Sequence, residues 1–219
     1  MNQDLVIAID GPSASGKGTV AQLVAERLGF AYLDSGALYR LTALAALQQG
    51  VAWTDEVAVA QVATELDVAF VGERILLASA DVALAIRAEE IGSGASQVAA
   101  LPMVRAALLQ RQREFLTAQG LVADGRDMGS VVFPSAKLKV FLSASAQVRA
   151  ERRYKQLIGR GEEADLALIT ADLQSRDDRD RQRAVAPLAQ SADAFLLETS
   201  NMNVETAVAQ ILDWWQLKR

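Results

Sequence analysis

One stretch of nine residues decides the fold of this chain: Gly11-Pro12-Ser13-Ala14-Ser15-Gly16-Lys17-Gly18-Thr19. A continuous apolar run, residues 5–9, precedes it, and apolar residues recur at helical spacing after it. A glycine-rich loop between a buried strand and a helix is the setting of a phosphate-binding loop. In such a loop, backbone N–H groups surround phosphate oxygens, and the N-terminus of the helix adds a favourable dipole. All nine residues are therefore predicted to bind the phosphates of a nucleotide.

Two side chains of this loop have a predicted chemical role. Lys17 can reach the β- and γ-phosphates, and Thr19 can face a Mg²⁺ ion. The strict motif has Ser or Thr directly after the lysine, whereas here Gly18 intervenes. The alternative interpretation is a tight strand-to-helix turn with a solvated lysine. Pattern and context together favour phosphate binding.

Short apolar runs recur along the chain and predict further strands at 30–33, 121–124, 138–142 and 194–197. Helical patterns fill the gaps between them, at 20–28, 39–49, 146–158, 164–183 and 204–217. Strands that alternate with helices imply a parallel sheet covered on both faces. The sequence therefore predicts an α/β protein of the P-loop NTPase fold, with a five-stranded parallel sheet.

Residues 51–100 break this alternation. Apolar residues alternate with others at 68–70, 75–77 and 82–86, which predicts a small antiparallel sheet inserted into the parallel core. Gly92-Ser93-Gly94 is a candidate hinge, and Pro102 is expected to open a helix that runs to about residue 119.

Three aspartates, Asp10, Asp34 and Asp124, each close a predicted core strand. Ligands of open parallel sheets bind beyond the carboxyl ends of the strands, where an aspartate can hold Mg²⁺ or its waters. Asp124 is the preferred magnesium residue. For Asp10, helix capping or turn formation is favoured, and for Asp34 both interpretations stay open.

Arginine supplies 17 of the 22 basic residues, and its planar fork suits bidentate contact with phosphate. Arg126-Asp127 follows Asp124 at the mouth of the expected site. Arg149, Arg152 and Arg153 share a helical face before Gly159-Arg160-Gly161, an arrangement that suits a mobile lid. Arg176, Arg179, Asp180 and Arg183 share a face of the next helix. That last run is open to a plainer interpretation, a surface helix with ion pairs such as Asp177–Arg181.

Composition excludes several chemistries. The chain of 219 residues has no cysteine and no histidine, which excludes disulfides, thiolate metal sites and Ser-His-Asp catalysis. The net charge of −5 disfavours a nucleic-acid partner. No apolar run reaches the length of a membrane span, and the N-terminus lacks the basic start of a signal peptide. We expect a cytoplasmic monomer that contacts neither nucleic acid nor membrane.

A P-loop protein that lacks histidine and is rich in arginine suits a phosphate acceptor. Such an acceptor is already an anion and needs no base, but arginines and Mg²⁺ must relieve the repulsion between two anions. Five motifs make the resemblance specific: residues 11–19, Asp34-Ser35-Gly36-Ala37-Leu38-Tyr39-Arg40, residues 95–100, residues 123–129 and residues 176–187. In this order they resemble the bacterial cytidylate kinases, within the nucleoside monophosphate kinase family.

That resemblance implies transfer of the γ-phosphoryl group of ATP to CMP or dCMP, with Mg²⁺. It implies catalytic roles for Lys17, Asp124, Arg126 and Arg153, the last acting from a lid. The acceptor phosphate would contact Ser35, Arg40, Arg126 and Arg183; cytosine would contact Ser96, Arg105 and Asp127; the ribose would contact Arg176 and Asp180; Tyr39 would line the pocket. Cytosine offers one amine donor and two acceptors, which suits a carboxylate together with arginine and serine.

The resemblance also implies three parts: a core of residues 1–35, 100–148 and 166–219, an inserted NMP-binding domain of residues 36–99, and a small lid of residues 149–165. Two alternatives remain open. One is a P-loop kinase for UMP or a small metabolite. The other is a nucleotide switch, although the Asn-Lys-x-Asp element of guanine-specific switches is absent. No sequence feature assigns the pocket for the ATP base.

Overall fold

The central strand β1 (Val6–Asp10) is buried along its whole length, because the sheet around it is covered on both faces. The structure is a computed structural model that describes residues 3–71 and 74–218. Within these residues β1 pairs in parallel with two neighbouring strands. The sheet has five strands in the order β2-β6-β1-β7-β8. The other four are β2 (Ala31–Asp34), β6 (Leu121–Gly125), β7 (Leu138–Ser143) and β8 (Phe195–Glu198).

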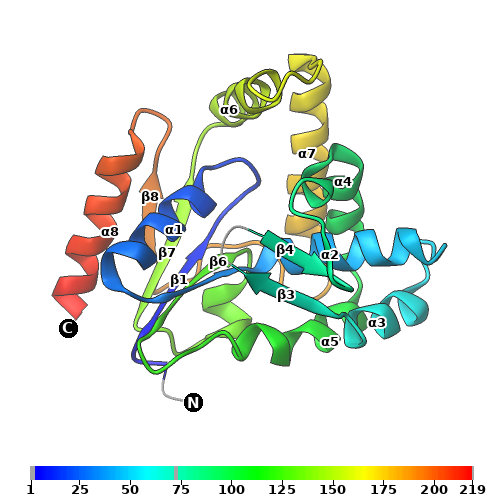
Figure 1. Cartoon of the computed structure of the whole chain (residues 1–219). Helices are drawn as coiled ribbons and strands as arrows, with labels where there is room; N and C mark the ends of the chain where they lie inside the picture. The colour runs from blue at the N-terminus through cyan, green and yellow to red at the C-terminus, as the bar shows by residue number, and fades with distance from the viewer. Residues whose placement is uncertain (1–2, 72–73, 219) are drawn as a thin grey trace. The chain divides into compact units, whose positions relative to one another are not determined.

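Helices connect these strands, as predicted. They are α1 (Lys17–Leu28), α6 (Ala146–Ile158), α7 (Leu166–Gln182), α8 (Val204–Lys218) and the short turn η2 (Met128–Val132). Figure 1 shows α1 beside α8, and both helices pack with Ile7, Ile9 and Val140 of the sheet in one apolar core. Trp215 of α8 is the largest fully buried side chain of that core. Burial of these apolar side chains between the helices and the sheet stabilises the sheet on which the loop after β1 is mounted.

The chain divides into two compact units, residues 1–33 with 115–219, and residues 34–114. The second unit contains α2 (Ser35–Gln48), α3 (Glu56–Thr64), β3 (Val68–Val71), β4 (Arg74–Leu77), β5 (Ala80–Asp81), the 3₁₀ turn η1 (Ala85–Arg87), α4 (Glu89–Val98) and α5 (Pro102–Arg113). Strands β3, β4 and β5 form the expected antiparallel sheet.

Three local expectations in this region were wrong. Residues 82–86 do not continue a strand, because β5 ends at Asp81 and η1 follows, with Ile86 buried and Leu84 exposed. Gly92-Ser93-Gly94 lies inside α4 and is no hinge, because the helix packs there against Trp53. Helix α5 ends at Arg113 rather than near residue 119, because Thr117 and Gly120 form a turn that leads into β6.

Helix α3 was not expected from the sequence, although Asp55 caps it with a side-chain oxygen that accepts a hydrogen bond from Ala58 N at 3.1 Å. Among the described residues, no helix is both long enough and apolar enough to cross a membrane.

Candidate active site

The loop between β1 and α1 has the shape that its glycines predict. A Cβ atom on Gly11 would stand 2.0 Å from the backbone oxygen of Leu142 in β7, so no other residue fits there. Ala14 and Gly16 have positive φ angles of 58° and 92°. These angles turn the chain tightly before Lys17 opens α1, which places the loop at the N-terminus of that helix.

Lys17 and Asp124 lie next to each other under this loop. The Lys17 Nζ atom lies 3.8 Å from Asp124 Oδ1 and donates a long hydrogen bond of 3.4 Å to Pro12 O. The other carboxylate oxygen of Asp124 accepts a hydrogen bond of 3.0 Å from the Tyr32 hydroxyl. A Cβ atom on Gly18 would stand 3.1 Å from that same oxygen. The glycine that departs from the strict motif therefore leaves room for the Asp124 carboxylate.

The residues here fit a Mg²⁺ ion that arrives with nucleotide phosphates. Mg²⁺ in kinase sites commonly takes one or two carboxylates, several waters and phosphate oxygens. Asp124 is one buried carboxylate beside Lys17, and Thr19 lies in the first turn of α1. The described part of the chain holds no group of three potential metal-binding side chains, so a cage made of protein alone is not present there.

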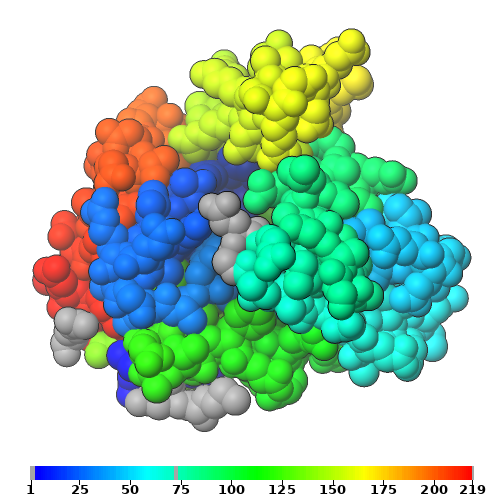
Figure 2. All heavy atoms as spheres, in the orientation of Figure 1, coloured from blue at the N-terminus to red at the C-terminus, as the bar shows by residue number. Residues whose placement is uncertain are grey.

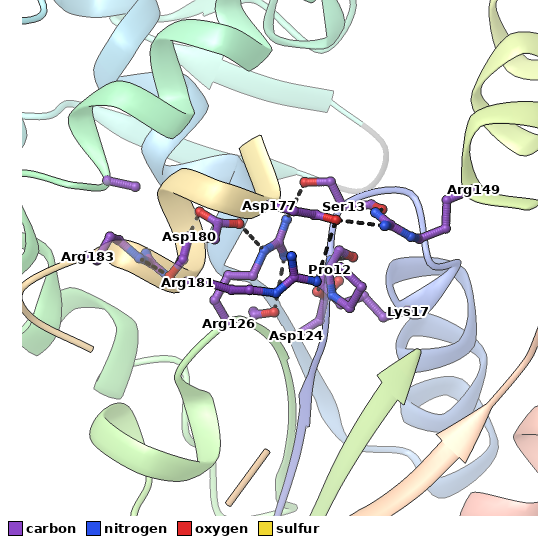
Figure 3. A network of polar contacts seen from close by, with 12 residues as sticks. Pro12, Ser13, Lys17, Asp124, Arg126, Arg149, Asp177, Asp180, Arg181 and Arg183 are labelled. Carbon is purple, nitrogen blue, oxygen red and sulfur yellow. Dashed lines mark hydrogen bonds and ion pairs between the residues drawn. The ribbon is translucent and has the colours of Figure 1, made fainter. Parts of the chain in front are cut away.

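Arg126 is the centre of a polar network (Figure 3). Its Nε atom donates to Asp180 Oδ2 of α7 at 2.8 Å, and its Nη2 atom donates to Ser13 Oγ of the phosphate loop at 2.8 Å. Burial alone would lower the pKa of Arg126, but the charge of Asp180 outweighs it and raises that pKa. In return, although burial opposes it, Arg126 and Arg183 hold the pKa of Asp180 below its usual value. The pair therefore stays ionised at the mouth of the loop.

Asp10 supports the segment that carries Arg126 and Asp127. Its two carboxylate oxygens accept hydrogen bonds from the backbone N–H groups of Met128 and Gly129, both at 2.8 Å. Burial raises the pKa of Asp10 to about 6, although these two bonds oppose the shift. Asp10 thus acts in turn formation, as favoured from the sequence. Asp34 caps α2, because its side chain accepts a hydrogen bond from Ala37 N at 3.0 Å. Of the two interpretations left open for Asp34, the structure therefore supports helix capping.

The three arginines of α6 have different surroundings. Arg149 is 4% exposed and pairs with Asp177 of α7 at 2.6 Å. Arg152 donates to Ser15 O at 2.8 Å and to Thr199 O at 2.7 Å. Arg153 is half-buried and donates to Gln156 Oε1 at 3.4 Å. The segment 158–163 at the end of α6 is exposed and drawn yellow in Figure 2. Arg149 also donates to Ser13 O at 3.0 Å, so two of the three arginines contact the phosphate loop.

One face of α7 is buried and charged, as the arginine pattern indicated. It presents Arg176, Asp177 and Asp180, and Arg183 follows at the end of the helix. Arg176 Nη2 lies 2.8 Å from Asp172 Oδ2, and Arg183 Nη2 lies 4.0 Å from Asp180 Oδ1. Arg179 is more exposed and donates to Ser175 Oγ at 2.8 Å, so the buried position on this face belongs to Asp177 instead.

The remaining predicted residues lie in the second unit. Ser35 and Tyr39 are buried in α2, and Ser96 is half-buried in α4. Arg40 Nη1 donates to Ile86 O at 2.8 Å, and Arg105 Nη1 donates to Ala99 O at 3.1 Å. The Arg105 guanidinium stands 5.8 Å from the centre of the Tyr39 ring, within cation–π range. Within this unit, this ring contact joins Tyr39 of α2 to Arg105 of α5.

A pocket of about 480 Å³ beside the phosphate loop was missed by sequence reasoning. Its lining includes Gly16 and Thr19 of the loop, Arg152 of α6, Thr199, and Met202 and Asn203 after β8. These residues lie far apart in the sequence and only the parallel order of β1, β7 and β8 brings them together. Residues 199–203 carry no motif that would have identified them.

Comparison with known proteins identifies the family. The family model described as cytidylate kinase matches residues 7–217. The chain belongs to the cytidylate kinase family. It is 61% identical over 214 residues to a cytidylate kinase of Chromobacterium violaceum, which covers 98% of this chain and 96% of that protein. A cytidylate kinase of Neisseria meningitidis serogroup C is 59% identical over 216 residues, 99% of each chain. The family resemblance inferred from the sequence is confirmed.

Solved structures with lower identity support the fold alone. An uncharacterized protein from Eubacterium ventriosum has a TM-score of 0.54 at 10% identity, covering 97% of this chain and 99% of that chain. A gluconokinase from Sinorhizobium meliloti has a TM-score of 0.50 at 15% identity, covering 99% and 94%. The predicted P-loop kinase fold of the cytidylate kinase family is therefore confirmed.

Proposed function

We propose that this protein transfers the γ-phosphoryl group of ATP to CMP, and to dCMP, giving ADP and CDP or dCDP for pyrimidine nucleotide metabolism. Membership of the cytidylate kinase family supports the reaction. The observation in the structure that carries it is the ionised Arg126–Asp180 pair in contact with Ser13 of the phosphate loop. This contact supports the proposal, because an arginine beside the phosphate loop can meet the phosphate of an acceptor.

The donor side consists of the phosphate loop, residues 11–19, and the pocket beside it. Lys17 neutralises charge on the β- and γ-phosphates. The apolar side chains of Val20, Met202 and Ala207 in the pocket suit the face of the adenine ring, and polar groups such as Asn203 suit its edge. We assign this pocket to the base of ATP.

Asp124 and Thr19 would hold Mg²⁺ bound to the donor phosphates. The ion supplies charge neutralisation of the transferring group when it is bound. The chain's own contribution is orientation: the Tyr32 hydroxyl and Lys17 fix both oxygens of the Asp124 carboxylate beside the loop.

The acceptor side rests on residues with three tasks. The phosphate of CMP is taken by arginines, because their forked donors match its oxygens. Cytosine is read by one carboxylate, one arginine and one serine, and the ribose by a charged pair on α7. We assign the phosphate to Ser35, Arg40, Arg126 and Arg183, cytosine to Ser96, Arg105 and Asp127, the ribose to Arg176 and Asp180, and the pocket wall to Tyr39.

Chemistry at the acceptor needs no general base. The CMP phosphate is already ionised, so the barrier comes from bringing two anions together in line. Arg126 approaches from the core, and Arg153 would approach from the lid, to offset that repulsion. We propose that residues 149–165 form this lid, residues 36–99 the NMP-binding domain, and the rest of the chain the core. Arg149 and Arg152 contact the phosphate loop and form the fixed base from which the lid extends.

We further propose that the enzyme acts as a monomer in the cytoplasm, with ATP and CMP or dCMP as its ligands and without nucleic acid or membrane. Gel filtration at micromolar concentration, with and without nucleotide, tests the monomer.

A panel of acceptors tests the function. Purified protein is supplied with ATP and Mg²⁺, and ADP production is followed with CMP, dCMP, UMP, AMP and GMP in turn. We expect the highest kcat/KM with CMP or dCMP. A higher value with UMP would replace the proposed acceptor. ATP binding without turnover on any acceptor would point to a regulatory nucleotide-binding protein instead.

A further inference from the structure

Ser13 of the phosphate loop is held by two arginines at once, as Figure 3 shows. Its side-chain Oγ accepts from Arg126 Nη2 at 2.8 Å, and its backbone oxygen accepts from Arg149 Nη1 at 3.0 Å. Each arginine also pairs with an aspartate of α7, Arg126 with Asp180 and Arg149 with Asp177. Because Asp177 and Asp180 lie three residues apart on one helix face, two Arg–Asp bridges run from α7 to the same residue of the loop.

The two bridges serve different purposes. Arg126 and Asp180 both belong to the proposed acceptor site. When CMP binds, they must therefore give up some of their present contacts to contact CMP. Arg149 and Asp177 have no role in substrate binding under the proposed function. They are 4% and 1% exposed, which places the ion pair inside the protein. The Arg149–Asp177 bridge can therefore keep its contact with Ser13 throughout a catalytic cycle.

The orientation of Arg149 is fixed at all three guanidinium nitrogens. Nη2 pairs with Asp177 at 2.6 Å, Nη1 donates to Ser13 O at 3.0 Å, and Nε donates to Ala144 O at 3.1 Å. A lysine has one nitrogen on a flexible stem and cannot serve three separate acceptors in a plane. The arrangement needs an arginine in this position and a carboxylate opposite it.

The loop needs support at this point. A loop that turns its N–H groups toward phosphate turns some of its carbonyl oxygens away, and those oxygens need other donors. Ala14 has a φ of 58°, a region that residues with side chains seldom occupy. Arg149 holds the carbonyl just before Ala14, and Arg152 holds that of Ser15 just after it at 2.8 Å.

We infer that Arg149, oriented by Asp177, is a positioning residue that keeps the phosphate loop in its phosphate-binding conformation. The inference rests on the proposed function, in which this loop binds ATP. Arg149 touches neither substrate in this account, and it acts through the Ser13 backbone. It follows that weakening this bridge should weaken ATP binding more than CMP binding.

Binding of ATP and of CMP, measured separately by calorimetry, tests this inference in Arg149→Lys and Asp177→Asn. We expect the dissociation constant for ATP to rise roughly ten- to a hundred-fold, because a displaced loop loses prearranged contacts. The constant for CMP should change by less than about threefold, a small effect on this scale. Because no acceptor turnover is needed, the ATP measurement is independent of whether CMP is the true acceptor.

Two controls separate positioning from general stability. Arg27→Lys alters an exposed ion pair with Glu205 at 2.7 Å, on α1 and α8, and should leave both constants unchanged. The double variant Arg149→Lys with Asp177→Asn should have the same dissociation constant for ATP as the single variant that binds ATP less tightly. The reason is that both substitutions act through the same Arg149–Asp177 bridge. A larger, additive loss in the double variant would overturn the inference.

An unpaired buried charge can prevent folding, so one further variant keeps the inference testable. Arg149→Met with Asp177→Leu replaces the pair by apolar side chains of similar volume, a change that buried ion pairs often tolerate. We expect this variant to fold and to show the same loss of ATP affinity. A folded variant of this kind that binds ATP as tightly as the wild type would overturn the inference.

Discussion

At the scale of single residues, the sequence predicted a site with the loop, Lys17 and Asp124, which lie together in the structure, but it did not predict what surrounds them. A motif specifies backbone shape and residue type at short spacing, so Gly11 and Gly16 were predictable. The burial of Arg149 against Asp177 joins residues 28 positions apart on two helices, and no local pattern encodes it. The same holds for the hydrogen bond from Tyr32 to Asp124, between residues 92 positions apart.

Asp127 tests base recognition. It is 2% exposed and follows Arg126 directly. In the proposed cytosine site, the Asp127 carboxylate would accept from the cytosine amine, whereas it would face the O4 acceptor of uracil, a mismatch that costs about 1–3 kcal/mol. Asp127→Asn can turn its amide to donate to O4. The variant should therefore have a lower activity on CMP, and its ratio of kcat/KM for CMP to kcat/KM for UMP should be smaller than that of the wild type.

The ratio of kcat/KM for CMP to kcat/KM for UMP is measured in the wild type and in Asp127→Asn, at the same ATP and Mg²⁺ concentrations. Equal losses on CMP and UMP would mean that Asp127 serves phosphate or metal chemistry. Base recognition would then rest on Ser96 and Arg105.

Asp10 predicts a pH-dependent stability. Its pKa is raised from 3.8 to about 6 in the folded protein by burial. Between these two values the unfolded chain has released the proton and the folded protein still holds it, so stability falls as the pH rises through this window. The groups that face Asp10 are Asp127, which raises its pKa, and Arg126, which lowers it.

The measurement is the free energy of unfolding in urea from pH 4 to 7, for the wild type and for Asp10→Asn. The wild type should lose up to about 3 kcal/mol relative to the variant across this range, at roughly 1.4 kcal/mol per pKa unit. A difference between the two proteins that does not change with pH would show that Asp10 titrates at its ordinary value.

At the scale of elements, the parallel core was predictable and the inserted region was predictable only in part. Core strands are continuous apolar runs with helices between them, and both signals are strong. In the insert, Val82, Leu84 and Ile86 alternate like a strand, but only the outer two are buried, and η1 places them there through a turn. Alternation over a few residues does not distinguish these structures.

Gly94 gives an element-scale prediction. A Cβ atom there would stand 2.5 Å from Trp53 Cζ2, and Trp53 is fixed by donating Nε1 to Ala43 O at 2.9 Å. Alanine favours a helix interior by about 1 kcal/mol over glycine, but forcing an atom into a packed site costs about 1–3 kcal/mol. Gly94→Ala should therefore lower the free energy of unfolding of the protein.

Urea denaturation measures this, and Trp53→Leu supplies the matched background. With the indole ring removed, Gly94→Ala should become neutral or stabilising, because only the helix preference remains. A stabilising effect in the presence of Trp53 would contradict the packing argument.

At the scale of the whole molecule, two compact units are joined where the chain passes between residues 33 and 34 and between residues 114 and 115. The proposed acceptor residues come from both units, with Arg126 and Asp180 in one and Arg40 and Arg105 in the other. Phosphoryl transfer requires water to be excluded from the reacting phosphates. We therefore predict that ligand binding reduces motion in the proposed NMP-binding domain and lid.

Hydrogen exchange followed by mass spectrometry checks this prediction. Peptides from residues 51–95 and 155–165 should exchange more slowly with CMP and a non-hydrolysable ATP analogue together than with either alone, because closure needs both ligands. Peptides from α8 serve as the internal reference, since this helix packs in the apolar core of the first unit and should not respond. Calorimetry under the same conditions establishes that both ligands are bound. Unchanged exchange in both segments at saturation would mean that the units do not close over the substrates, and that the acceptor arginines must already be in place before binding.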